Sequence, residues 1–144
     1  MYRFKPAGAV WWQKPLVLFE NQSVPAEIAI LRSELKRGEA GIWKNSSSLS
    51  TGVIDLRTSA ASSFETVRIQ IPASITTVLR DLYKVAGLSK GCPDLVVWRK
   101  SDARVRFIEI KRKGHDSITK EQEQFISAAQ SAGVSVRTIY WDFL

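Results

Sequence analysis

GCPDLVVWRKSDARVRFIEIKRKG, residues 91–114, is the stretch that decides the fold. Two short apolar runs flank a polar turn, which predicts a β-hairpin. With the turn centred on residues 101–102, Asp94 comes opposite Glu109, and the alternation of side chains puts Asp94, Glu109 and Lys111 on one face. The turn lacks an Asn-Gly pair, so a register displaced by a residue or two is the alternative.

Two carboxylates that face each other on a strand pair are unfavourable for stability. Directly opposite each other they repel, and the pKa of one of them rises unless a cation joins the pair. Lys111 is one candidate cation, and a divalent metal such as Mg²⁺ or Mn²⁺ is a stronger one. A metal-bound water beside a lysine suits phosphodiester hydrolysis. The alternative is an ordinary charged strand face, because an Asp…Glu-x-Lys pattern also arises by chance.

The charge balance favours a polyanionic partner. Residues 90–120 hold nine Lys or Arg and four Asp or Glu, which is +5 of the formal net charge of +7. Nucleic acid is the usual partner of such a segment, and solubility is the other interpretation. The single cysteine excludes an intrachain disulfide framework and favours a reducing, cytoplasmic setting. We expect no membrane partner, because no apolar run reaches the roughly 18 residues of a membrane span.

The remaining chain alternates between helical and strand patterns. Ile28, Leu31 and Leu35 fall on one helical face, and a hairpin with a long loop is expected in the middle of the chain. The predicted helices are residues 25–37, 75–87 and 119–133, and the predicted strands are 16–19, 53–57, 66–71 and 134–141. The predicted end signals are Pro25 and Gly38, then Ser74 and Gly87, then Thr119 with Gln122 and Gly133. This order predicts a single α/β or α+β domain over residues 1–144.

Several short motifs follow one another in the second half of the chain. They are GCPDLVVW at 91–98, EIK at 109–111, SITKEQEQF at 117–125 and Gly133. Together they resemble the VRR-NUC domain, a branch of the PD-(D/E)xK nucleases, and especially the C-terminal nuclease domain of the Fanconi-associated nucleases. The resemblance covers roughly residues 72–142. It implies a restriction-endonuclease-like α/β core, with a mixed central sheet flanked by helices and residues 38–73 as an insertion.

The resemblance also implies roles for individual residues. Asp94, Glu109 and the backbone carbonyl of Ile110 would bind the metal, and Lys111 would position or activate water. Gln122 would be the family's glutamine on the following helix, whereas the residues alone predict that it caps that helix. Both roles are compatible.

The N-terminal helix would add an acidic metal ligand. Glu27 is the first candidate and Glu34 the second, and a solvated helix position is the alternative for each. Phosphate contacts are expected from basic residues near the hairpin. These are Lys90, Arg112, Lys113 and Lys120.

The function implied is that of a Mg²⁺- or Mn²⁺-dependent DNA endonuclease. Family members of this size act on branched DNA such as four-way junctions, are encoded by bacteria and phages and work as homodimers, and the Fanconi-associated relatives act on flaps in DNA repair. Two alternatives are a sequence-specific restriction-type endonuclease and a catalytically silent DNA-binding protein.

Overall fold

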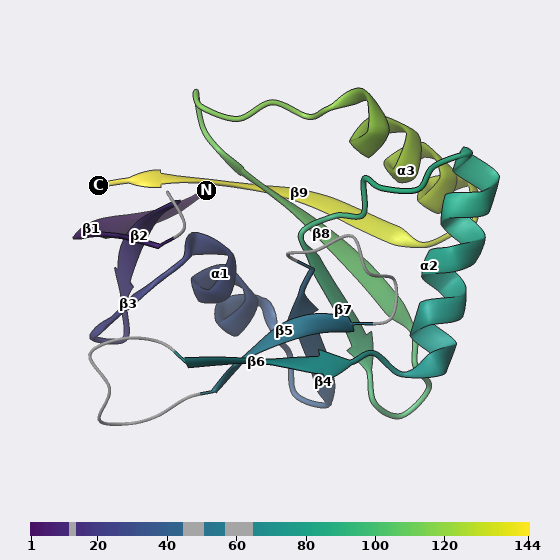
Figure 1. The fold of residues 1–144 in the computed structure, drawn as a ribbon, viewed down its shortest axis with the longest axis horizontal. Coiled ribbons are helices and arrows are strands. Elements are labelled where there is room, and N and C mark those ends of the chain that lie inside the picture. The colour runs from purple at the N-terminus through teal and green to yellow at the C-terminus, as the bar shows by residue number, and fades with distance from the viewer. Residues whose placement is uncertain (12–13, 45–50, 57–64) are drawn as a thin grey trace.

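The computed structural model describes residues 1–11, 14–44, 51–56 and 65–144. These residues form three helices and nine strands (Figure 1). The helices are α1 (Ala26–Glu34), α2 (Ala73–Ala86) and α3 (Lys120–Ser131). The strands are β1 (Tyr2–Trp11), β2 (Lys14–Phe19), β3 (Gln22–Val24), β4 (Glu39–Trp43), β5 (Thr51–Leu56), β6 (Glu65–Gln70), β7 (Leu95–Arg99), β8 (Val105–Arg112) and β9 (Ser135–Phe143).

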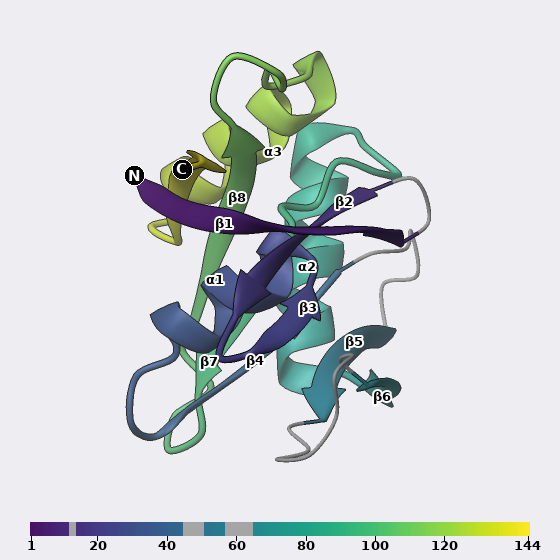
Figure 2. The same ribbon diagram turned by 90° about the vertical axis from the view of Figure 1, so that its left-hand side faces the viewer.

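All nine strands join one mixed sheet in the order β3-β2-β1-β9-β8-β7-β4-β5-β6. The strands β1 and β8 each run parallel to β9, and the other neighbouring strands are antiparallel. Helices α2 and α3 cover one face, and α1 lies on the other, where β1–β3 fold over it (Figure 2). The predicted mixed sheet flanked by helices is confirmed.

The hairpin of β7 and β8 has the predicted register. Trp98 pairs with Val105 and Leu95 with Ile108, so the turn is centred on residues 101–102. Asp94 lies one residue before β7 rather than inside it. Continuing the register by one step still brings Asp94 opposite Glu109.

Both faces of β8 are covered, which explains its nearly continuous apolar character. Ile108 and Ile110 pack into the core around α1, whereas Val105 and Phe107 pack into the core around α2 and α3. Because side chains alternate, Glu109 belongs to the same face as Phe107. The buried Glu109 side chain on β8 therefore points toward α3.

Helix α1 is buried along most of its length. Every residue from Ala26 to Arg32 is buried, and the helix contacts apolar side chains of β1–β3 as well as those of the central strands. Gly41 on β4 permits this close approach, because a Cβ there would come within 2.9 Å of the Leu31 side chain. The predicted apolar face of this helix is confirmed.

Several predictions about the elements were wrong. Among the first 24 residues only 16–19 were predicted to be a strand, but the described residues there form β1, β2 and β3, and β4 was not predicted either. Helix α1 ends at Glu34, with Pro25 at its N-cap and not inside its first turn, and it does not extend to residue 37. Pro72 and not Ser74 occupies the N-cap of α2.

Other predictions about the elements are confirmed. Gly87 ends α2 in the left-handed conformation with φ of 69°. Thr119 and Gln122 form the capping box of α3, and Gly133 follows its end at φ of 73°. Strands β5 and β6 pair as a hairpin, although their long connecting loop lies outside the described residues. In the described part of the chain, no helix is long and apolar enough to span a membrane.

Candidate active site

The candidate site begins with Glu109, in the middle of β8. Its side chain is fully buried, although an ionised carboxylate is strongly stabilised by water. It lies there because its neighbours Ile108 and Ile110 fill the opposite face of the sheet, so alternation turns Glu109 toward α3. A buried acid on a core strand is costly for stability, which suggests a chemical role.

Asp94 meets Glu109 at the open end of the β7–β8 hairpin. Its Oδ2 accepts a hydrogen bond of 2.8 Å from the backbone N–H of Ile110. The backbone carbonyl of Asp94 accepts a second bond, of 2.7 Å, from the N–H of Lys44. Asp94 is therefore held by the strands on both sides of β7, and its carboxylate is directed at β8.

The loop before Asp94 is fixed by α2 and α3. The hydroxyl of Tyr83 on α2 accepts a hydrogen bond of 3.0 Å from the backbone N–H of Cys92. Gly91 has φ of 105°, and a Cβ there would come within 3.1 Å of the Glu121 backbone on α3. Burial raises the pKa of the Cys92 thiol to about 12, so this cysteine packs and is a poor nucleophile.

Lys111 and Gln122 complete the cluster. The Lys111 ammonium donates to Gln122 Oε1 at 2.9 Å and lies 3.3 Å from Glu109 Oε1. The Gln122 amide donates to the same Glu109 oxygen at 3.0 Å. Gln122 also accepts a bond from the backbone N–H of Thr119, so one side chain both caps α3 and binds Glu109 and Lys111 of β8.

The electrostatics of Glu109 follow from this geometry. Burial is the largest cause that raises its pKa to about 9, and the neighbouring Asp94 carboxyl raises it further. Lys111 acts in the opposite direction but does not offset the other two effects. Without a metal, the Glu109 carboxyl therefore holds a proton at neutral pH.

One atom of the cluster lacks a partner. Among the described residues, Glu109 Oε2 is the buried side-chain oxygen or nitrogen atom with no hydrogen bond. Leaving such an atom unpaired normally costs about 1–3 kcal/mol. A hard cation between Asp94 and Glu109 would use this oxygen and would remove the repulsion between the two carboxyls. The donor set therefore fits a divalent metal.

The predicted third acidic ligand does not join the pair in this structure. Within the described residues, no group of three His, Cys, Asp or Glu side chains could hold a metal ion. Glu27 is buried in the first turn of α1, on the other face of the sheet from α3. Glu34 is engaged elsewhere, because its two oxygens accept from Tyr2 at 2.6 Å and Arg137 at 3.0 Å. Its assignment as the second candidate is therefore not supported, and the role of Glu27 stays a prediction.

The four predicted phosphate contacts differ in their surroundings. Three of them are exposed lysines. Lys90 lies on the loop before Asp94, Lys113 in the turn after β8, and Lys120 at the start of α3. Arg112 is half-buried, with its guanidinium 4.8 Å from the ring centre of Phe143 and 3.4 Å from Asp142. Arg112 is thus already engaged within the protein, whereas the three lysines face solvent around the carboxylates.

Comparison with known proteins bears on the identity of this site. A model of the VRR-NUC domain family matches residues 34–141. A search of curated proteins finds no match. Among solved structures, the chain is similar to paFAN1 bound to a 2-nucleotide 5′ flap DNA with a gap, at 22% identity and a TM-score of 0.40. That similarity covers 48% of this chain and 13% of the other, so the present chain spans a small part of that protein's length.

The family match covers well over half of the 144 residues. It includes α2, the β7–β8 hairpin and α3, and with them Asp94, Glu109, Lys111 and Gln122. The fold is restriction-endonuclease-like, and the chain belongs to the VRR-NUC family of nuclease domains.

Proposed function

We propose that this domain is a divalent-metal-dependent DNA endonuclease that hydrolyses phosphodiester bonds, with selectivity for branched DNA. One observation carries the proposal. A buried carboxyl pair with an unpaired oxygen, Glu109 Oε2, lies beside a lysine that is held in place by hydrogen bonds. This donor set binds Mg²⁺ or Mn²⁺ and places a positive charge next to it.

The metal would be held by Asp94, Glu109 and the backbone carbonyl of Ile110. When bound, it would supply an activated water and stabilise negative charge on the phosphate. The backbone N–H of Ile110 orients Asp94 through its 2.8 Å bond. Gln122 leaves Glu109 Oε2 open by donating to the other oxygen of the same carboxyl.

Lys111 would act on the attacking water or on the developing charge of the phosphate. Its side chain is only 9% exposed and its ammonium is fixed by Glu109 and Gln122. A cation that is already fixed before the substrate binds loses little order during the reaction, so it stabilises the transition state efficiently. The ammonium also keeps a donor for a substrate oxygen, because it carries three hydrogens.

DNA would approach the side on which the exposed lysines lie. Lys90 and Lys120 belong to segments in contact with each other, since Gly91 packs against the backbone of Glu121. Lys113 lies in the turn that follows β8. Phosphate contacts by these three residues would position the duplex without reading its sequence.

The branched substrate is the finer part of the proposal. It is supported by the resemblance of the motifs to family members that act on junctions and flaps. A homodimer, which would cut a four-way junction symmetrically, and a cytoplasmic, bacterial or phage setting are proposed on the same ground.

The test is a cleavage assay on labelled DNA. The substrates are a four-way junction, a 5′ flap, single-stranded DNA and linear duplex, each with Mg²⁺, Mn²⁺ or EDTA. We expect metal-dependent cutting of branched DNA, and a loss of about 10²- to 10³-fold in kcat for Lys111→Ala. Lys84→Ala is the matched control, because this lysine is exposed on α2.

Other outcomes would assign a different function. Cutting at a defined sequence in linear duplex would indicate a restriction-type enzyme. DNA binding without cutting, with every metal and substrate, would indicate a catalytically silent DNA-binding protein. Equal loss of activity in Lys111→Ala and Lys84→Ala would contradict the assignment of the site.

A further inference from the structure

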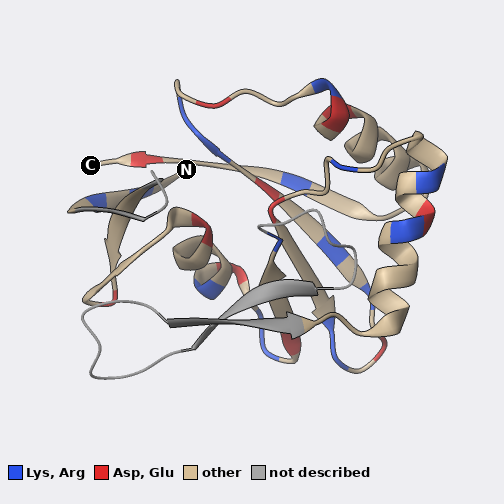
Figure 3. Ribbon diagram, viewed as in Figure 1, with Lys and Arg blue, Asp and Glu red and all other residues tan. Residues whose placement is uncertain are grey.

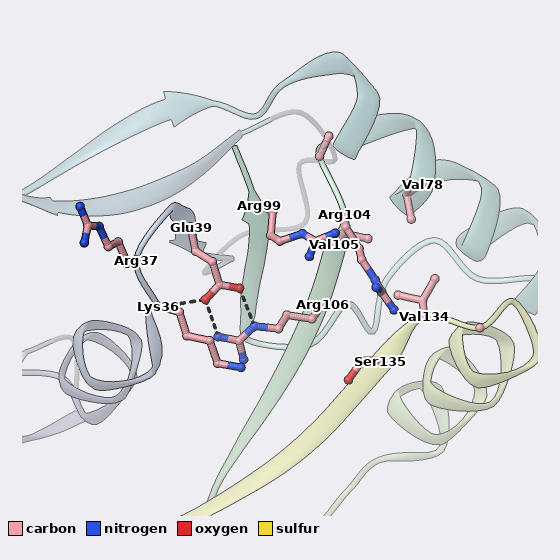
Figure 4. A pocket seen from close by; sticks show the side chains of 12 residues that line it. Lys36, Arg37, Glu39, Val78, Arg99, Arg104, Val105, Arg106, Val134 and Ser135 are labelled. Atoms are coloured by element: carbon pink, nitrogen blue, oxygen red, sulfur yellow. Dashed lines mark hydrogen bonds and ion pairs between the residues drawn. The ribbon is translucent and has the colours of Figure 1, made fainter. Parts of the chain in front are cut away.

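A second feature of the molecule lies at the other end of the β7–β8 hairpin from the carboxylates. It is a pocket of about 540 Å³ (Figure 4). Its walls come from the α1–β4 connection, the β7–β8 turn, one residue of α2 and the α3–β9 turn. Nothing in the proposed catalytic step uses it.

The pocket is strongly basic. Five of its lining residues are Lys or Arg, and Glu39 is its one carboxylate. The basic residues are Lys36, Arg37, Arg99, Arg104 and Arg106. Val78, Val105 and Val134 supply an apolar wall beside them (Figure 4).

Two of these arginines are neutralised within the protein. Arg106 donates two hydrogen bonds of 3.0 Å to Glu39, and Arg99 is paired with Asp102 in the hairpin turn. The Arg106 pair fixes the floor of the pocket, because it ties β8 to the start of β4. Neither arginine is therefore the main source of attraction for a ligand.

The other three cations are less strongly neutralised, because none of them is held in a side-chain ion pair within the described part of the chain. Arg37 and Arg104 are exposed, and no hydrogen bond or ion pair within the described part of the chain engages either guanidinium. Lys36 is likewise exposed. These three cations lie around one concave surface. The single carboxylate that lines it, Glu39, is already bound by Arg106, so the pocket attracts a polyanion.

The position of the pocket indicates which polyanion. Between residues 90 and 120, the Lys and Arg positions gather toward the two ends of the β7–β8 hairpin, near the carboxylates and near this pocket (Figure 3). Val105 at the pocket and Glu109 at the site are four residues apart on β8, or about 13 Å at roughly 3.3 Å per residue. A single small anion would fill one end, whereas a DNA backbone can contact both.

We propose that the pocket is a second DNA-binding site, which holds the sugar–phosphate backbone of the substrate away from the cleaved bond. This inference rests on the proposed function of the carboxylate site. At roughly 3.4 Å per base pair, a separation of about 13 Å corresponds to about four base pairs. Arg37 and Arg104 bind phosphates there, and the valine wall excludes water from these contacts.

The test measures DNA binding in EDTA, so that no cleavage occurs. Fluorescence anisotropy compares wild type with the double variant Arg37→Ser/Arg104→Ser at several salt concentrations. We expect the slope of log K against log salt to fall in magnitude by about 2, because two phosphate contacts are lost. At roughly 0.15 M salt we expect the Kd for long-armed DNA to rise about tenfold.

Arm length makes the test specific. Cleavage by the wild type first locates the bond that is cut. The DNA on each side of that bond is then shortened separately. DNA with fewer than about four base pairs on the relevant flank should bind the double variant and wild type equally. The control is Arg80→Ser/Lys84→Ser, which removes the same charge from exposed positions of α2 outside this pocket.

Two results would overturn the inference. One is equal weakening by the control, which would show diffuse attraction to the net charge. The other is an unchanged salt slope in the pocket variant. If wild type binds DNA but never cuts it, the proposed function fails, and comparing long with short duplex still decides the role of the pocket.

Discussion

Glu109 is a single residue whose burial is only partly compensated by its neighbours. Its carboxyl is fully buried and one of its oxygens has no partner. Lys111 and Gln122 both bind the other oxygen. The arrangement leaves a lone pair of Oε2 beside Asp94, which is the geometry that a cation would complete.

We therefore expect metal to stabilise the folded domain. Adding Mg²⁺ or Mn²⁺ at about 100 times its Kd should raise the free energy of unfolding by about 2.7 kcal/mol. Thermal unfolding of the EDTA-treated protein, with and without added metal, measures the effect. Glu109→Gln should abolish the metal-induced rise in Tm.

The metal-free Tm provides the control for this prediction. Glu109→Gln replaces the buried acid with a neutral side chain of the same shape, so the variant should fold without metal at least as well as wild type. A wild-type Tm that does not respond to either metal would contradict a metal site at Asp94 and Glu109.

Glu27 can be tested in the same way. If it becomes a metal ligand, Glu27→Gln should reduce the metal-induced rise in Tm while Glu34→Gln leaves it unchanged. Glu34 is the matched comparison, because it is on the same helix but its oxygens are bound by Tyr2 and Arg137. Equal responses of the two variants would remove Glu27 from the site.

The sequence was a good guide to some residues of the site and not to others. Asp94, Glu109 and Lys111 could be placed together because strand alternation and a short turn depend on local spacing. The hydrogen bonds of Glu34 with Tyr2 and Arg137 could not be predicted, because those partners are 32 and 103 residues away in the sequence. Contacts over such separations depend on the order of the strands, which local patterns do not contain.

Among the elements, α3 has a function beyond covering the sheet. Its capping box places Gln122 where the side chain reaches both Glu109 and Lys111. Gln122→Ala should therefore lower both stability and kcat. Thr119→Ala should cost about 1 kcal/mol of stability through the lost cap but should leave the contacts of Gln122 to β8 intact.

The two variants separate capping from positioning. Urea unfolding should show a loss of stability in both variants, larger in Gln122→Ala, and steady-state kinetics should show a loss of kcat mainly in Gln122→Ala. A fall of kcat in Thr119→Ala as large as that in Gln122→Ala would mean that the end of α3, and not the amide, controls the rate.

The pair of Glu39 and Arg106 links β4 to β8 and makes stability depend on pH. The hydrogen bonds from Arg106 are the largest cause that lowers the pKa of Glu39 below its ordinary value of 4.5. A lowered pKa means that the pair stabilises the fold above the unfolded-state pKa and that this contribution is lost as pH falls through the folded-state value. Glu39→Gln should cost about 2 kcal/mol at pH 7.

Urea unfolding at pH 7 and at several acidic values checks this prediction. The difference between wild type and Glu39→Gln should shrink as the pH falls below about 4.5. Asp102→Asn is the control, because Asp102 and its partner Arg99 are both exposed and the pair is well solvated. A difference that stays constant with pH would assign the effect of Glu39→Gln to packing.

The elements that the sequence did not predict share a physical cause. β1 contains Pro6 and Gly8, which favour irregular structure, and its pairing with β2 shifts between Pro6 and Val10. β4 is short and contains Gly41, whose lack of a side chain serves the packing of α1. Both are strands because their neighbours in the sheet pair with them, and tertiary pairing overrides weak local preference.

At the scale of the whole molecule, the residues before the family match belong to the same core as the site. Phe4 on β1 is 6% exposed and packs with Trp141 on β9 at 6.1 Å between ring centres. The core that contains it includes Ile108 and Ile110, the two neighbours of Glu109. The backbone carbonyl of Phe4 also accepts a bond from the N–H of Leu144.

This shared core predicts that the N-terminal strands and the site unfold together. Phe4→Ala should lower the free energy of unfolding by about 3–5 kcal/mol, because it leaves a cavity against Trp141. Urea unfolding followed by tryptophan fluorescence and by loss of metal binding should give one coincident transition, with an unchanged m-value. Val85→Ala, at an exposed position of α2, should change stability by less than about 0.5 kcal/mol. Two separate transitions in Phe4→Ala, with the metal site surviving the first, would show instead that β1–β3 are an independent addition to the nuclease core.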